Sequence, residues 1–231
     1  MNNLAPETIG PEAIDNTISF EAMRHAMVQS QLRTNAVNDP RVVTAMGRVP
    51  REAFVPEGAR RLAYRDTAVA IGNGRYLNLP IATGKLLTEA YLEPTDKVLL
   101  IGAAGGYTAA LLSGLVRTVV AVESDADLAA HARGALAGYG NVELVEGPLD
   151  QGHQAGAPYD VLIVDGCVEA LPESLVGQVA PGGRVVTGLR ERGVSRLASG
   201  RTIKGAFGLR AFADVDCVTL PGFSVPRGFA F

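Results

Sequence analysis

A glycine-rich segment, Gly102-Ala103-Ala104-Gly105-Gly106-Tyr107, is the part of the chain whose residue types and spacing most clearly indicate ligand chemistry. It follows the apolar run Lys97–Ile101 directly and precedes a stretch with helical spacing. At such a strand-to-helix turn, backbone N–H groups face the carboxyl edge of a parallel sheet, where nucleotides and nucleosides bind. The position after Gly106 is tyrosine, so the third glycine of a dinucleotide loop is missing and NAD and FAD are disfavoured.

An acidic residue about twenty positions further on strengthens this interpretation. Glu123 ends a second β-branched run, Thr118–Glu123, and Ser124 follows it. A carboxylate at that place can accept hydrogen bonds from both hydroxyls of a ribose. S-adenosylmethionine has a ribose but no phosphate, so we expect it as the cofactor. The alternative is that the glycines only form a tight turn and that Glu123 is an exposed charge.

Residues after the next two expected strands complete the candidate cofactor site. Pro148 and Leu149 follow the run Val142–Val145, and Asp165 ends the run Tyr159–Asp165. We expect all three near the ligand, with Asp165 as a polar contact. The alternative for Asp165 is a helix cap or a surface residue. No second and third ligand accompany it in the sequence, so no metal site is expected.

Alternating strands and helices would position these residues. The expected strands are Lys97–Ile101, Thr118–Glu123, Val142–Val145, Tyr159–Asp165 and Arg184–Leu189, and the expected helices are Tyr107–Leu115, Asp125–Ala137 and Pro172–Val179. This order predicts an α/β protein with a doubly wound, mostly parallel sheet. Two further strands, Val194–Thr202 and Leu209–Leu220, predict an antiparallel pair that closes the sheet.

The residues before this core predict a different kind of layer. Helical spacing is seen at Phe20–Leu32, Asp39–Met46 and Ile81–Tyr91, whereas proline and glycine break up Val49–Pro80. We therefore expect a flexible arm at residues 1–18 and one domain at 19–231. Within it, 19–92 form a helical and irregular layer and 93–231 form the Rossmann-like core.

Composition and charge narrow the function classes. The formal net charge is −3 and no Lys/Arg cluster is present, so nucleic acid and anionic membranes are not expected as partners. No apolar stretch is long enough to span a membrane. Cys167 and Cys217 match no metal spacing and are expected to be buried, reduced thiols, which favours a cytoplasmic location. The oligomeric state is left open.

The chain resembles the protein-L-isoaspartate O-methyltransferase family from about Met27 to Leu189. The stretches that carry the resemblance are MVQSQLRTNAVNDPRVVTAMGRVPREAFVPE, AYRDTAVAIGNGRYLNLP, KVLLIGAAGGYTAALL, VVAVESDADLAAHARGAL, YDVLIVDG and VAPGGRVV. The resemblance implies the Rossmann-like fold of S-adenosylmethionine-dependent methyltransferases. It also implies methyl transfer from S-adenosylmethionine to the isoaspartyl carboxylate of a protein or peptide.

Several positions depart from the family's motifs. Asn78 stands where the family has the serine that approaches the reacting carboxylate, which makes it the candidate catalytic residue. Leu100 replaces the acid that ends the first strand, Ala104 the middle glycine, and Pro148 the aspartate near adenine. These substitutions leave open a catalytically inactive relative that acts as a binding or assembly module. A nicotinamide oxidoreductase is a third, more distant alternative.

Overall fold

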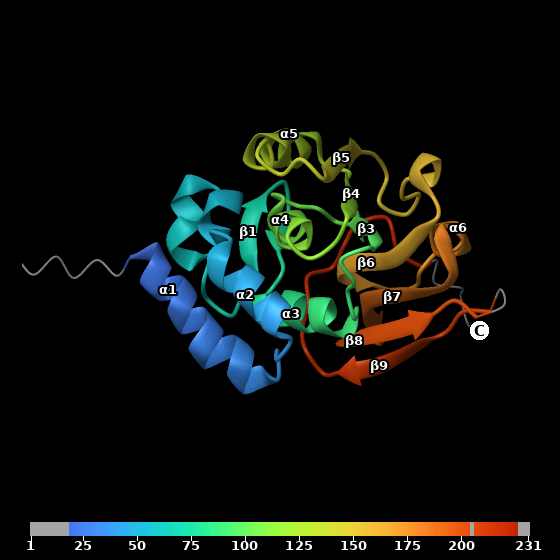
Figure 1. The fold of residues 1–231 in the computed structure, drawn as a ribbon, viewed down its shortest axis with the longest axis horizontal. Coiled ribbons are helices and arrows are strands. Elements are labelled where there is room, and N and C mark those ends of the chain that lie inside the picture. The colour runs from blue at the N-terminus through green and yellow to red at the C-terminus, as the bar shows by residue number, and fades with distance from the viewer. Residues whose placement is uncertain (1–18, 204–205, 226–231) are drawn as a thin grey trace, which may run out of the picture.

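The computed structural model describes residues 19–203 and 206–225 (Figure 1). The flexible arm predicted for residues 1–18 lies outside the described residues, as does the end of the C-terminal tail at 226–231.

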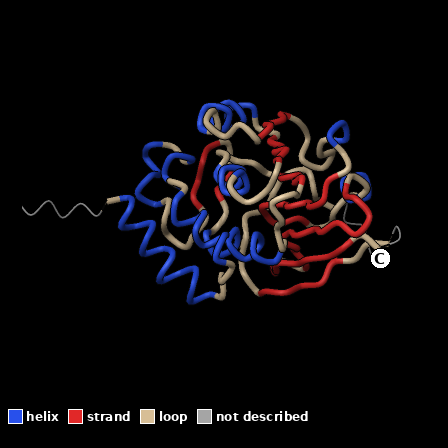
Figure 2. The backbone as a smooth tube through the Cα atoms, in the orientation of Figure 1, coloured by secondary structure: helices blue, strands red, loops and turns tan. Residues whose placement is uncertain are grey.

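A seven-stranded sheet in the order β5-β4-β3-β6-β7-β8-β9 forms the centre of the fold (Figure 2). Strands β3 to β7 run parallel, whereas β8 and β9 are antiparallel to their neighbours. The bounds are β3 (Lys97–Ile101), β4 (Thr118–Glu123), β5 (Val142–Glu146), β6 (Tyr159–Val168), β7 (Val179–Glu191), β8 (Val194–Arg201) and β9 (Leu209–Ala213). This confirms the predicted doubly wound α/β fold with an antiparallel C-terminal strand pair.

Two hydrophobic clusters cover the two faces of the sheet. On one face Val98 and Leu100 pack with helices α3 (Pro80–Glu89), α4 (Tyr107–Ser113) and α5 (Ala126–Ala135). On the other face Leu99 and Ile101 pack with α6 (Glu173–Val176) and with Leu220 and Phe223 of the C-terminal segment. Burial on both faces explains why the parallel strands read as continuous apolar runs rather than as alternating patterns.

The N-terminal layer packs against the first of these clusters. Helix α1 (Phe20–Met27) continues as a π-helical turn, and α2 (Pro40–Arg48) begins at Asp39, whose carboxylate accepts hydrogen bonds from two backbone N–H groups. The layer's short helical turns and strands are η1 (Val28–Leu32), η2 (Arg33–Asn35), η3 (Arg51–Phe54), η4 (Glu57–Leu62), β1 (Val69–Gly72) and β2 (Arg75–Leu77). A further short turn, η5 (Gln154–Gly156), lies outside this layer, between β5 and β6. The region predicted as wholly irregular thus contains a β-hairpin, because Gly72 and Gly74 form a turn rather than only interrupting the chain.

Two elements are much shorter than the sequence predicts, by four residues or more. The helix expected at Pro172–Val179 has one turn, Glu173–Val176. The strand expected to reach Leu220 ends at Ala213. Ala213 pairs with Leu197, and only three residues of β8 lie between Leu197 and the preceding turn, so β8 offers few further partners.

After β9 the chain leaves the sheet edge and crosses the carboxyl ends of β6 and β3. It is the red trace that rises from β9 in Figure 1. We call residues 214–225 the C-terminal strap. No helix within the described residues is long and apolar enough to cross a membrane.

Candidate functional site

The site lies at the carboxyl ends of β3, β4 and β6, where the strand order reverses direction. The chain proceeds from β3 to β4 and β5 on one side and then returns to β6 and β7 on the other. The helical connections therefore diverge at β3 and β6 and leave a crevice between them, where ligands of open α/β sheets bind. This is the edge to which the sequence assigned the glycine loop.

The glycine loop follows β3 into this crevice. Backbone N–H groups of Gly102 and Ala103 each donate to the carbonyl of Val122 at 3.0 Å. Gly102, Ala104 and Gly106 all have positive φ, at 82°, 51° and 100°. Alanine tolerates this region less well than glycine, so Ala104 holds a conformation that the family's glycine adopts freely. A Cβ on Gly105 would lie 2.1 Å from the carbonyl oxygen of Phe54, so this side of the loop is packed tightly against η3.

Glu123 is completely buried at the end of β4, and the protein's own groups satisfy its carboxylate. Arg75 of β2 forms a two-pronged ion pair with it, at 2.5 Å and 3.1 Å. The backbone N–H groups of Ala104, Ser124 and Asp125 donate to the same carboxylate at 2.7, 2.8 and 3.0 Å. The alternative of an exposed strand-end charge is therefore wrong. Arg75 therefore occupies the carboxylate that the sequence predicted to accept from a ribose.

Asp165, at the end of β6, is the centre of a second buried network. Its carboxylate accepts from Asn78 Nδ2 at 2.9 Å, from Thr83 Oγ1 at 3.2 Å and from Thr108 Oγ1. Since the residue is buried and its donors are side chains rather than helix N–H groups, the alternative of a helix cap or surface aspartate is wrong. Asp165 therefore links Asn78, the candidate catalytic residue, to helices α3 and α4.

The buried guanidinium of Arg51 contacts one member of this network, Asn78. Arg51 is fully buried, and it donates through Nε to the carbonyl of Ala63 at 2.6 Å and through Nη2 to the carbonyl of Asn78. Its Cζ lies 4.7 Å from the centre of the Tyr107 ring, a cation–π contact. Burial lowers the pKa of Arg51, and the nearby Asp165 carboxylate acts in the opposite direction.

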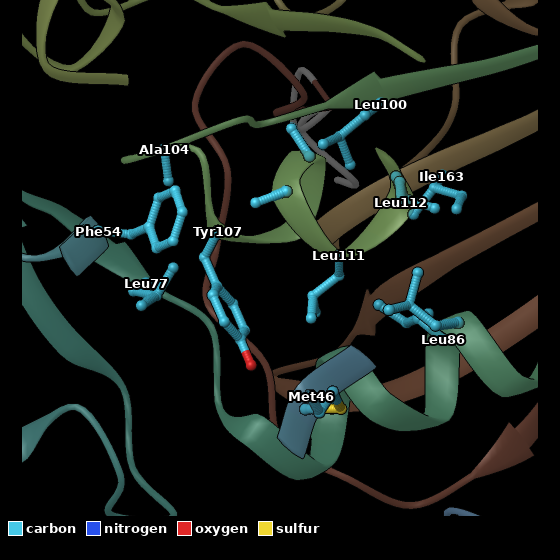
Figure 3. Close-up of a cluster of buried hydrophobic side chains, with 14 of the residues drawn as sticks. Met46, Phe54, Leu77, Leu86, Leu100, Ala104, Tyr107, Leu111, Leu112 and Ile163 are labelled. Carbon is cyan, nitrogen blue, oxygen red and sulfur yellow. The ribbon is translucent and has the colours of Figure 1, made fainter. Parts of the chain in front are cut away.

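Tyr107, the last residue of the loop, packs beside Phe54 with ring centres 5.8 Å apart (Figure 3). Neither its hydroxyl nor Arg51 Nη1 has a hydrogen-bond partner among the described residues. Burial raises the pKa of Tyr107 to about 12. Tyr107 is thus part of the core beneath the loop, with its hydroxyl enclosed.

We expect the Tyr107→Phe variant to resist alkaline unfolding better than the wild type. The unfolded tyrosine ionises near pH 10 and the folded one near 12, so the folded state binds more protons between these values. Stability is therefore full below pH 10 and declines from 10 to 12, by on the order of 2 kcal/mol for this residue. Urea unfolding at pH 8 and pH 11 measures this.

At pH 8 the variant should match the wild type within about 0.5 kcal/mol, because no hydrogen bond is lost. Tyr64 and Tyr159, whose pKa values burial also raises, stay in both proteins and account for a remaining alkaline slope. Equal alkaline losses in the two proteins would show that Tyr107 ionisation is not coupled to folding.

The other predicted residues lie around the crevice. Leu100 is buried in the cluster that also contains Ile163 and Leu112 (Figure 3). Leu149 is buried on the opposite face beside Leu220. Pro148 and Ser124 line a hollow of about 440 Å³ at the crevice rim. The structure therefore brings the loop, Ser124, Pro148, Leu149 and Asp165 to one edge, whereas the Leu100 side chain belongs to the core.

In this conformation the crevice itself is filled by the chain. A Cβ on Gly102 would lie 3.0 Å from Leu220 Cδ1, so the leucine covers the first glycine of the loop. The groups present have the chemistry of a nucleoside site, but in this conformation Leu220 lies over its first glycine.

Comparison with known proteins decides the family. A model of the family "Protein-L-isoaspartate(D-aspartate) O-methyltransferase" matches residues 22–221, which is most of the chain. The chain belongs to this family. Protein-L-isoaspartate O-methyltransferase 1 of Rhodopseudomonas palustris (strain HaA2) is 41% identical over 178 residues, covering 76% of this chain and 73% of the relative. The enzyme of Synechococcus sp. (strain JA-2-3B'a(2-13)) is 40% identical over 185 residues, covering 79% and 76%.

Solved structures show the same fold at lower identity. A putative isoaspartate methyltransferase of Plasmodium falciparum, in complex with S-adenosyl-L-homocysteine, has a TM-score of 0.73 and 20% identity over 85% of this chain and 97% of its own. A second protein-L-isoaspartate O-methyltransferase also has a TM-score of 0.73, with 22% identity over 88% of this chain and 66% of its own. The predicted family and methyltransferase fold are confirmed.

Sequence reasoning missed two cations at the site, as well as the hydroxyl donors Thr83 and Thr108. Arg75 and Arg51 are cations in segments that read as irregular, and each contacts residues that are distant in sequence. In the structure, Arg75 starts the short strand β2, in which it and Leu77 are both buried and Tyr76 is exposed. This alternation places Arg75 on the inner face.

Proposed function

We propose that this protein binds S-adenosylmethionine in the crevice and methylates the isoaspartyl carboxylate of damaged proteins or peptides. Family membership over residues 22–221 carries the proposal. The glycine loop at the carboxyl end of β3 and Glu123 at the end of β4 support it, because they supply backbone donors and a carboxylate of the kind a nucleoside needs. S-adenosylmethionine would supply an activated methyl group.

The cofactor would lie between the glycine loop, Ser124, and the residues Pro148 and Leu149 after β5. Asn78 is the proposed contact for the substrate carboxylate, since it lies at the same edge of the sheet as Asp165. Asp165 holds the Asn78 amide and is a positioning residue. Because methyl transfer to a carboxylate depends mainly on alignment, a fixed amide donor in place of a hydroxyl is compatible with the reaction.

Three other aspects of the function stay predictions. These are a cytoplasmic location, the absence of nucleic acid and membrane partners, and the division into an arm at 1–18 and one domain at 19–231. All the relatives named above carry the methyltransferase name, so the comparisons give the non-catalytic alternative no support.

A methylation assay tests the proposal. The full-length protein, S-adenosylmethionine with a labelled methyl group and a peptide containing one isoaspartyl residue should give a base-labile methyl ester. The matched control is the same peptide with an ordinary aspartyl residue, which should stay unlabelled. In parallel, S-adenosylhomocysteine should raise the melting temperature, by an amount that grows with the logarithm of its concentration above Kd. No transfer, together with no binding at millimolar ligand, would reject the proposed function.

A further inference from the structure

The C-terminal strap (residues 214–225) lies across the crevice that the proposed function requires to be open. We propose that this strap is an internal occupant of the cofactor site, and that S-adenosyl ligands bind only after it has moved away. The inference rests on the proposed function, because it concerns access to the same site. Four observations support it.

The first is main-chain pairing with the end of β6. The N–H of Cys167 donates to the carbonyl of Val218 at 2.6 Å, and the N–H of Leu220 donates to the carbonyl of Cys167 at 3.0 Å. Cys167 and Thr219 form an isolated parallel bridge. The strap therefore lies in an extended conformation on the strand end that forms one wall of the crevice.

The second is a row of glycines that makes room for the strap. A Cβ on Gly166 would lie 2.6 Å from Leu220 Cγ and 2.8 Å from the carbonyl oxygen of Val218. A Cβ on Gly188 would lie 2.2 Å from Cys217 Sγ, and Gly102 is covered by Leu220 as described above. Because any side chain at these positions would collide with the strap, the surface beneath it fits an occupying segment closely.

The third is a hydrogen bond between the strap and Asn78, the candidate catalytic residue. Asn78 Oδ1 accepts a hydrogen bond from the N–H of Val218 at 3.3 Å, while its Nδ2 donates to Asp165 at 2.9 Å. The side chain that would face the substrate carboxylate is therefore used to hold the strap. The strap thus covers both the proposed cofactor position and the proposed position of the substrate carboxylate.

The fourth is the shape of the surface beside the strap. A hollow of about 450 Å³ on one side is lined by Arg75, Ser124, Thr219 and Pro221, among others. A hollow of about 440 Å³ on the other side is lined by Ser124, Pro148 and Pro221. Ser124 and Pro221 belong to both, so the strap divides one groove at the carboxyl edge into two parts.

The strap belongs to no strand ladder, and its outer contacts are exposed polar pairs such as Arg196 with Asp214 and Arg190 with Thr219. Exposed pairs of this kind contribute little stability. The buried side chains Cys217, Val218, Leu220 and Phe223 supply most of the hold.

Substituting Leu220 separates occupancy from a merely structural role. If the strap competes with the ligand, the measured Kd equals the intrinsic Kd divided by the open fraction. Leu220→Ala should therefore lower the Kd for S-adenosylhomocysteine by about tenfold or more. The matched control is Leu92→Ala, which truncates an equally buried leucine at the opposite, amino edge of the sheet, before β3. Calorimetry should show an unchanged Kd for Leu92→Ala.

A thiol probe reports the strap's position directly. The chain has two cysteines, so Cys167→Ser leaves Cys217, on the strap, as the only thiol. Saturating S-adenosylhomocysteine should speed the reaction of Cys217 with a thiol reagent about tenfold or more, because the ligand holds the strap open. If the ligand bound with the strap in place, it would stabilise the fold and slow the reaction instead.

The outcomes separate the two proposals. Tighter binding by Leu220→Ala with ligand-accelerated labelling of Cys217 supports the strap as an occupant. Binding with an unchanged Kd in Leu220→Ala, or with slower labelling, overturns the strap proposal and leaves the proposed function intact. If neither the wild type nor Leu220→Ala binds the ligand, the proposed function fails, and the displacement proposal fails with it.

Discussion

Replacing Glu123 with alanine is expected to lower the free energy of unfolding by about 3 to 5 kcal/mol, because it leaves the Arg75 guanidinium buried without its partner. The pair is among the most enclosed in the molecule, with side chains 8% and 0% exposed. The N–H groups of Ala104, Ser124 and Asp125 lose their acceptor in the same variant. Urea unfolding followed by circular dichroism measures the change, provided the slope m stays constant.

The control is a pair of further variants at the same site. Arg75→Met should cost less than Glu123→Ala, since three backbone donors still satisfy the carboxylate. The double variant Arg75→Met with Glu123→Leu should be more stable than Glu123→Ala, because neither charge is then left alone. If Glu123→Ala lost less than about 1 kcal/mol, the ion pair would not hold the loop to β4 and β2.

Asp165→Ala is expected to cost on the order of 4 kcal/mol. It removes the acceptor of three buried donors, Asn78, Thr83 and Thr108, and it takes away a carboxylate that favours the charged form of the buried Arg51. A buried donor without a partner keeps its full desolvation cost, which exceeds what a satisfied hydrogen bond contributes. Urea unfolding at neutral pH is again the measurement.

Thr83→Val is the matched control for Asp165→Ala. It deletes one of the three donors at nearly constant shape and leaves the carboxylate with two partners, so about 1 kcal/mol should be lost. Similar losses in the two variants would contradict the view that Asp165 organises the network. They would also remove the reason for treating it as the residue that positions Asn78.

The sequence by itself determined the sheet and the place of the loop. β3, β4 and β6 are short runs of apolar and β-branched residues. Such runs are typical of parallel strands that are buried on both faces of a sheet. The loop Gly102–Tyr107 is joined directly to β3, so its position at the carboxyl edge followed from the strand. The family's stretches then indicated the fold, and the comparisons confirmed it.

Only the tertiary structure decided what the predicted residues contact. Glu123 is paired with a residue 48 positions away, and Asn78 contacts Asp165 and Val218 at separations of 87 and 140. No local pattern encodes such partners, because they depend on how a β-hairpin, a sheet edge and the C-terminal strap are packed together. The strap up to Leu220 read as a strand because it continues the strand-like run Leu209–Leu220. Its apolar side chains are buried over the crevice instead of extending β9 along β8, since glycines at 102, 166 and 188 leave room there and β8 has few residues left to pair.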